Sequence, residues 1–242
     1  MAVYYRTQGF IFKNKDISEA DRVFSIFTYD FGRLEVFGKA IRKITSKLRG
    51  GIEIFSFSEI EFIQGKNRKT LTDTISIKKF NNIIQEPARL EICHKIGDIL
   101  DNFIKGQQKE ELISALLNET LNKLNDQNYL SRLTYYYFFW NFLSIMGYCP
   151  EIYKCAICGS KLNPDILYFS DNAGGIVCKN CFKVGLELEK INSDIVKILR
   201  LILKKDWQTL SRLKVGIVSQ ELLEKVSNNY YHYILPCPSS GV

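Results

Sequence analysis

The chain has 242 residues, enough for one large domain or for two or three small ones. Its hydrophobic fraction of 46% is that of an ordinary folded protein, and no apolar run reaches the length of a membrane-spanning helix, which excludes a membrane-embedded chain. The net charge is +7, and residues 1–80 hold fifteen basic and nine acidic side chains. A basic first third attached to a nearly neutral remainder predicts a polyanionic partner.

The first eighty residues carry the patterns of β-strands. Ile60 and Phe62 alternate with glutamates, and Leu71, Ile75 and Ile77 alternate with threonines and serine, so each set is expected to face inward. Five such segments predict a small β-barrel, with an OB-fold as the leading candidate and an SH3-like barrel as the alternative. The expected strands are residues 5–12, 22–29, 33–39, 58–64 and 70–78.

A basic connection follows the third expected strand. No acidic residue occurs between Glu35 and Glu53, and this connection holds five cations. Cations cannot be buried unpaired, so they face solvent or a ligand, and clustered cations favour the phosphates of a nucleic acid. The candidate nucleic-acid-binding residues are Lys39, Arg42, Lys43, Lys47 and Arg49.

Nine aromatic residues lie in the expected barrel, and some of them could stack on bases. Most are expected to form the core instead, and the sequence does not separate the two groups. They are Tyr4, Tyr5, Phe10, Phe12, Phe24, Phe27, Tyr29, Phe31 and Phe37.

After Pro87 the apolar residues recur with the period of a helix. The segment around residues 130–144 is apolar almost all round and predicts a central helix. Ser193 is expected to cap the helix that follows the cysteines. The predicted organisation is an OB-fold domain at 1–80, an α-helical domain at 81–148 and 186–235, a zinc ribbon inserted at 149–185, and a flexible tail at 236–242.

Two C-x-x-C knuckles, nineteen residues apart, are the strongest chemical signal in the chain. Each knuckle offers two sulfurs from one tight turn, so two knuckles predict a four-thiolate zinc site. A site with four protein ligands has no open position and is structural. We therefore expect one structural Zn²⁺ per chain, held by Cys155, Cys158, Cys178 and Cys181.

The sequence gives weaker support to structural disulfides and to a catalytic function. The N-terminus lacks the pattern of a secretory signal peptide, and Cys93, Cys149 and Cys237 are single, which suits a reducing cytoplasm. The chain has two histidines, no Walker-type phosphate loop, no G-x-S-x-G and no H-E-x-x-H. We therefore expect a protein that is not an enzyme.

The order of these parts, and several local segments, resemble the bacterial recombination mediator RecO family. Its first strand is similar to residues 5–11 and its second to residues 19–23. Its first hairpin turn is similar to residues 28–32. Its basic loop and the next strand resemble residues 40–47 and 53–55. The resemblance covers essentially the whole chain.

The resemblance implies DNA repair and homologous recombination. Members of the family bind single- and double-stranded DNA and anneal complementary strands. They act on DNA coated by the single-strand-binding protein, whose acidic C-terminal tail docks on the helical domain. With RecR they help to load RecA. A cytoplasmic, nucleoid-associated location without membrane contact is expected.

The residues themselves leave two alternatives open. An OB-fold does not distinguish RNA from DNA, so an RNA-binding or translation-associated protein would show the same pattern. A non-catalytic scaffold whose basic loop binds acidic proteins is the other. Comparing affinity for matched DNA and RNA strands separates the first alternative from a DNA-binding protein.

Overall fold

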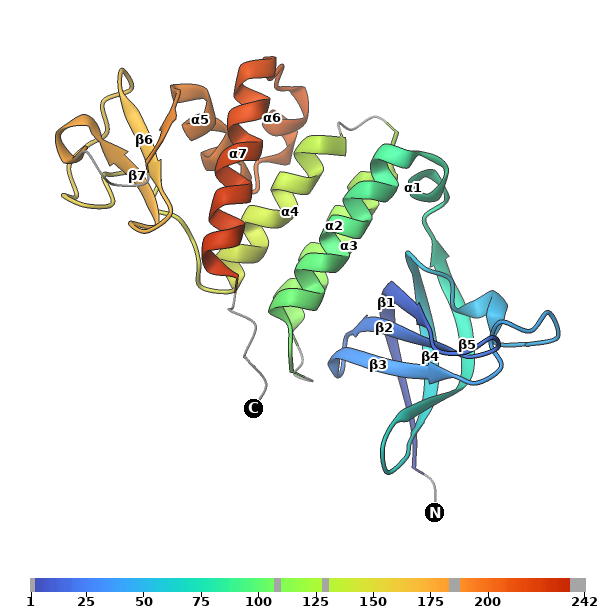
Figure 1. Cartoon of the computed structure of the whole chain (residues 1–242). Coiled ribbons are helices and arrows are strands. Elements are labelled where there is room, and N and C mark those ends of the chain that lie inside the picture. The colour runs from blue at the N-terminus through green and yellow to red at the C-terminus, as the bar shows by residue number, and fades with distance from the viewer. Residues whose placement is uncertain (1–2, 107–109, 128–130, 183–187, 236–242) are drawn as a thin grey trace. The chain divides into compact units, whose positions relative to one another are not determined.

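The computed structural model describes residues 3–106, 110–127, 131–182 and 188–235. By its internal contacts the chain divides into two compact units, residues 1–131 and 132–242. A β-barrel and three helices make up the first unit (Figure 1). The second unit combines helices with a small three-stranded sheet. The predicted fold class is therefore confirmed, whereas the finer domain boundaries stay predictions and the tail at 236–242 lies outside the described residues.

Five strands close into a barrel in the order β1-β2-β3-β5-β4, the compact form predicted from the sequence. Strand β1 pairs with β4 through its first half and with β2 through its second half. The two pairings overlap at Gly9 and Phe10. A Cβ atom at Gly9 would lie 2.7 Å from the carbonyl oxygen of Phe27. The bounds of β1 to β5 are Tyr4–Asp16, Arg22–Thr28, Gly32–Gly38, Ser56–Gln64 and Lys69–Lys79.

Apolar side chains from all five strands fill the barrel. Ile60 and Phe62 face this core as predicted, while Glu59 and Glu61 of the same strand form ion pairs with Arg6 outside. The buried core cluster comprises Ile11, Phe24, Ile26, Leu34, Val36, Ile41, Ile52, Ile60, Phe62 and Leu71.

The predicted inward face of β5 is wrong beyond Leu71. Leu71 is buried, but Ile75 and Ile77 are 54% and 47% exposed. The pairing of β4 with β5 shifts by one residue at Thr72 and again at Ile77. Because side chains alternate along a strand, the β-bulge at Thr72 moves Ile75 to the opposite face, and Ile77 is itself the unpaired residue of the second bulge.

Helix α2 packs directly on the barrel. A Cβ atom at Gly97 would lie 3.1 Å from the carbonyl oxygen of Phe12, and the rings of His94 and Phe55 meet edge to face, 4.7 Å apart. Proline suits the first turn of a helix because the N–H it lacks has no partner there, and α2 begins at Pro87. The helices of this unit are α1 (Asn81–Gln85), α2 (Pro87–Phe103) and α3 (Glu111–Asn125).

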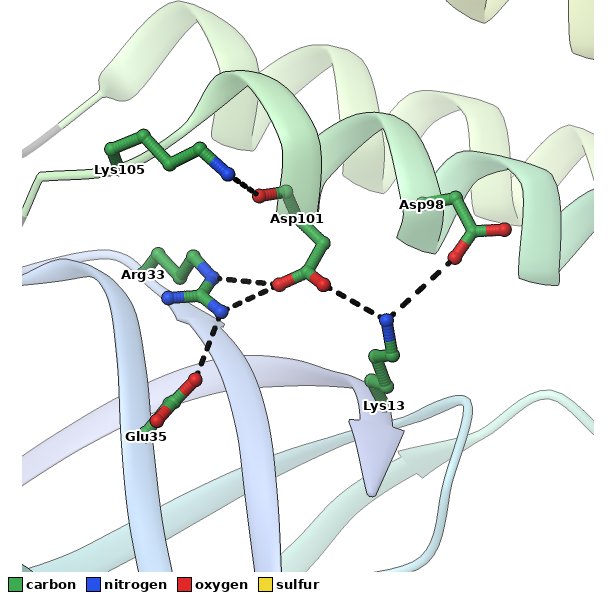
Figure 2. A network of polar contacts seen from close by, with 6 residues as sticks. All are labelled: Lys13, Arg33, Glu35, Asp98, Asp101 and Lys105. Carbon is green, nitrogen blue, oxygen red and sulfur yellow. Dashed lines mark hydrogen bonds and ion pairs between the residues drawn. The ribbon is translucent and has the colours of Figure 1, made fainter. Parts of the chain in front are cut away.

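A polar network joins α2 to strands β1 and β3 (Figure 2). The carboxylate of Asp101 accepts three hydrogen bonds, from Lys13 Nζ at 2.8 Å and from Arg33 Nε and Nη2 at 3.0 and 2.5 Å. Partial burial by itself would raise the pKa of Asp101, but these bonds and the positive charges of Lys13 and Arg33 together outweigh burial and hold the pKa below its usual value. The network therefore stabilises the packing of α2 on the barrel only while Asp101 is ionised.

Replacing Asp101 with Asn is expected to lower the free energy of unfolding of the first unit by about 1–2 kcal/mol at pH 7, since the charge assistance of three hydrogen bonds to a half-buried group is lost. Because the folded pKa is depressed, the difference from wild type should shrink as the pH falls below about 4. Urea unfolding at both pH values measures this. Asp98, more exposed and 3.9 Å from Lys13, is the control. An effect of Asp98→Asn as large as that of Asp101→Asn would contradict the assignment.

The second unit is built around α4 (Ser131–Ile145), the central helix predicted from its apolar sequence. Trp140 is fully buried; its ring stacks on Tyr230 at 5.3 Å and its Nε1–H donates to Ser227. Phe169 of the small sheet meets the same indole edge to face. Thus α4, the last helix and the sheet share one aromatic core. The remaining helices are α5 (Ser193–Leu203), α6 (Trp207–Arg212) and α7 (Ile217–Ile234).

The cap of α5 differs from the prediction by one residue. Asn192, not Ser193, occupies the N-cap, and its side chain accepts the backbone N–H of Ile195 at 3.0 Å. Both residue types cap helices well, so burial of the apolar face of α5 decides between them. Within the described residues, no helix is long and apolar enough to cross a membrane.

Candidate nucleic-acid interface and metal centre

The basic loop, residues 39–51, lies in the connection between β3 and β4, and both of its ends form contacts with the barrel. Ala40 has a positive φ of 51°, and its N–H donates to Asp21 Oδ1 at 2.7 Å. That bond, more than any other contact, lowers the pKa of Asp21. Ile41 is buried in the barrel core. Thr74 Oγ1 donates to the carbonyl oxygen of Gly51 at the other end of the loop. Both ends of the loop are therefore fixed.

All five predicted cations of this loop are exposed. Arg42 is held at the base, where its guanidinium lies 3.4 Å from Asp16 and donates to the carbonyl oxygen of Ser18. In the part of the chain that the structure describes, Lys43 and Lys47 form no ion pair, and neither do Lys39 and Arg49. The loop thus presents to solvent four cations that form no ion pair among the described residues, an arrangement suited to binding phosphates.

Most of the nine barrel aromatics belong to the interior, as expected. Phe10, Phe12, Phe24, Phe27 and Phe37 are buried. The rings of Tyr5 and Phe31 are half-buried and contact Phe62. Tyr29 is half-buried against Phe57. Of the nine, only Tyr4 is largely exposed, at 62%.

A second group of cations was missed by the sequence reasoning. Lys66 and Arg68 lie in the turn between β4 and β5, and Lys69 begins β5. The Arg68 guanidinium lies 3.9 Å from the centre of the Phe37 ring. The signal was present in the sequence, because three cations occur within four residues with no acidic residue nearby. The parallel pairing of β3 with β5 places this turn beside the end of β3.

The four knuckle cysteines meet in the second unit. Their Sγ atoms all lie within 4.8 Å of one another, and those of Cys158 and Cys178 are 3.8 Å apart. In a tetrahedral zinc site with bonds of about 2.3 Å, neighbouring sulfurs are about 3.8 Å apart. The geometry and the donor set therefore fit a metal ion.

Local backbone structure presents these sulfurs. Gly159 adopts a φ of +71° directly after the first knuckle, and its N–H donates to the carbonyl oxygen of Cys155 at 2.9 Å. Cys178 ends β7, and its N–H points to Cys155 Sγ at 3.4 Å. Cys181 ends a short 3-10 helix. The supporting sheet runs in the order β7-β6-β8, with bounds Gly175–Cys178, Leu167–Ser170 and Glu189–Ile191.

Contacts in and beside the cluster shift the pKa values of two of its thiols in opposite directions. Hydrogen bonding from the Ser160 hydroxyl, more than any other contact, lowers the pKa of Cys158 to about 6. The hydrogen bond to Cys158 raises the pKa of Cys181 to about 12. Four adjacent thiolates repel one another, so all four can ionise together only if a cation compensates their charge. By contrast, Cys93 is buried in α2, where burial raises the pKa of its thiol.

Two family models match the chain. The model described as Recombination protein O N terminal matches residues 1–80, and the model described as Recombination protein O C terminal matches residues 85–238. Proteins named DNA repair protein RecO are similar along most of their length. The chain is 32% identical over 212 residues to one from Dehalococcoides mccartyi, covering 88% of this chain and 83% of that protein.

Two further relatives with the same name are more distant. The protein from Caldanaerobacter subterraneus is 25% identical over 227 residues, covering 94% of this chain and 91% of its own length. The protein from Roseiflexus is 26% identical over 231 residues, covering 96% of this chain and 81% of its own length. The similarity therefore includes the barrel, the helices and the cysteine module.

Proposed function

Because the chain belongs to the RecO family of DNA repair and recombination proteins, we propose that it binds single- and double-stranded DNA and anneals complementary strands. The observation that carries this proposal is the exposure of all five cations of the basic loop, four of which form no ion pair among the described residues. A fixed loop with several cations can contact successive phosphates without reading sequence. The five loop residues Lys39, Arg42, Lys43, Lys47 and Arg49 are the proposed contacts.

Charge explains how such a surface promotes annealing. Two complementary strands repel each other through their phosphates, and a cationic surface that binds both reduces this repulsion and raises their local concentration. Base pairing then supplies the free energy. The reaction needs no nucleotide hydrolysis, so a protein that is not an enzyme can perform it.

The partners proposed from family membership are RecR, RecA indirectly, and the acidic C-terminal tail of the single-strand-binding protein. Such a tail needs an apolar groove with a nearby cation. Arg132 is exposed near the start of α4 and Tyr148 is 42% exposed just after its end. The apolar side chains in the middle of α4 are buried, so the proposed groove would lie near one end of this helix, beside either Arg132 or Tyr148.

For the cysteine module we propose one zinc ion bound by Cys155, Cys158, Cys178 and Cys181. Four thiolates and no open position make the proposed ion structural. When bound, it would supply the compensating charge that holds the two knuckles together. It would thereby stabilise the small sheet whose Phe169 packs on Trp140.

Annealing is the decisive test of the proposed function. We expect the purified protein to accelerate pairing of two complementary strands without ATP, both on bare strands and on strands coated with the single-strand-binding protein. The acceleration should fall steeply with added salt, because each phosphate contact releases counterions. Fluorescence quenching on pairing measures the rate. A rate equal to that of the strands alone, at low salt and saturating protein, would refute the proposal.

A further inference from the structure

A pocket opens on the barrel beside the turn between β4 and β5. Its volume is about 500 Å³, within the usual range for small-ligand sites. Ile17 follows β1, Val23 lies on β2 and Phe37 lies on β3, and these three give it an apolar part. Its remaining walls are mostly charged. A pocket with an apolar part and charged walls suits a ligand in which an anionic group is joined to an apolar ring.

The charge of this pocket is strongly positive. Five cations line it, against the single carboxylate of Glu35; the cations are Arg33, Lys66, Arg68, Lys69 and Lys105. Figure 2 shows that two of these have structural partners: Arg33 pairs with Asp101, and Lys105 Nζ donates to the backbone oxygen of Asp101. Among the described residues, the cations Lys66 and Arg68 of the β4–β5 turn and Lys69 at the start of β5 form no ion pair. These three remain available to an anion.

Arg68 is held in place for such an anion. Its guanidinium lies over the ring of Phe37, 3.9 Å from the ring centre, and Phe37 itself is only 7% exposed. A guanidinium has five N–H donors, so its contact with one ring leaves donors free to form a fork with two phosphate oxygens. A side chain already ordered by stacking loses less conformational entropy when it binds.

The pocket is contiguous with the basic loop. Arg68 lies over the ring of Phe37, and only Gly38 separates Phe37 from Lys39 in the chain. Lys39 is the first residue of the loop, and Arg68 lines the pocket. A single strand that crosses the loop can therefore continue to the pocket.

We propose that this pocket binds one phosphate of a single-stranded nucleic acid together with the adjoining sugar and base, as a subsite distinct from the basic loop. Arg68 is its principal phosphate ligand, Lys66 and Lys69 add charge, and Ile17 and Val23 contact the apolar part of the nucleotide. The inference rests on the proposed DNA binding and extends it to a named site.

The test compares Arg68→Ala and Arg68→Lys with wild type, using a fluorescent twenty-residue oligothymidylate and a salt series. Arg68→Ala should bind about tenfold more weakly, as expected for loss of a charge-assisted contact, and its log–log salt slope should fall by about 0.7. Arg68→Lys keeps the charge without the planar fork and should be intermediate. Lys95→Gln, an equal charge change on α2, should match wild type. If Arg68→Ala lowers the melting temperature, Lys66→Ala at the exposed turn replaces it.

Three outcomes overturn the subsite. If these variants match wild type while substitutions in the basic loop weaken binding, the pocket is not used and the proposed function stands. If Arg68→Ala abolishes binding of thymidine monophosphate but leaves the oligonucleotide unaffected, the pocket serves a free nucleotide. If wild type fails to bind the oligonucleotide at low salt, the proposed function itself fails, and the subsite with it.

Discussion

Replacing Cys178 with Ser is expected to release the proposed zinc and unfold the cysteine module. Binding of structural zinc contributes about 10–16 kcal/mol to folding in isolated zinc-finger peptides. Loss of one thiolate ligand from a closed four-thiolate site should therefore reduce metal content from about one ion per chain toward zero. Metal analysis after purification without chelator measures this, and limited proteolysis of the module reports its unfolding.

The damage should extend to the helices of the same unit, because Phe169 of the small sheet contacts both Trp140 and Tyr230. Cys149→Ser is the matched control, since Cys149 is exposed and outside the cluster; it should retain its metal and its resistance to protease. Wild-type protein that is free of metal with four intact thiols, or that contains two disulfides, would contradict the zinc assignment.

Substitutions in the basic loop are expected to have the second large effect, a loss of affinity for single-stranded DNA. The triple variant Lys43→Ala, Lys47→Ala and Arg49→Ala should bind single-stranded DNA at least about tenfold more weakly at low salt, since charge-assisted contacts are lost. If all three contact phosphates, the log–log salt slope should fall by about 2, at about 0.7 per contact. Arg42 is left intact because it ties the loop to Asp16. Anisotropy titrations across a salt series measure both quantities.

The fold of the loop variant should be unchanged, because exposed charges without partners contribute little to stability. A matched control replaces Lys95, Lys197 and Lys225, which lie on α2, α5 and α7 and change the net charge equally. This control should bind DNA almost as wild type does. If the loop variant keeps both the affinity and the slope of wild type, the DNA surface lies elsewhere on the protein.

Features that depend on short spacing were predictable from the sequence. A C-x-x-C knuckle sets two sulfurs on one turn, so the meeting of Cys155, Cys158, Cys178 and Cys181 follows from their spacing. The absence of acidic residues between Glu35 and Glu53 likewise required exposed cations, because unpaired charges are not buried. The alternation of Ile60 and Phe62 with glutamates fixed the inner face of β4.

Features that depend on pairing between distant segments were decided only by the tertiary structure. Residues 70–78 alternate regularly in sequence, yet bulges at Thr72 and Ile77 leave Ile75 and Ile77 on the outside, because strand register is set by the partner strand. The stacking of Arg68 on Phe37, and with it the charged pocket, exists because β3 pairs with β5 across the closed barrel. Local sequence carries no information about that closure, since the two strands are about thirty residues apart in the chain.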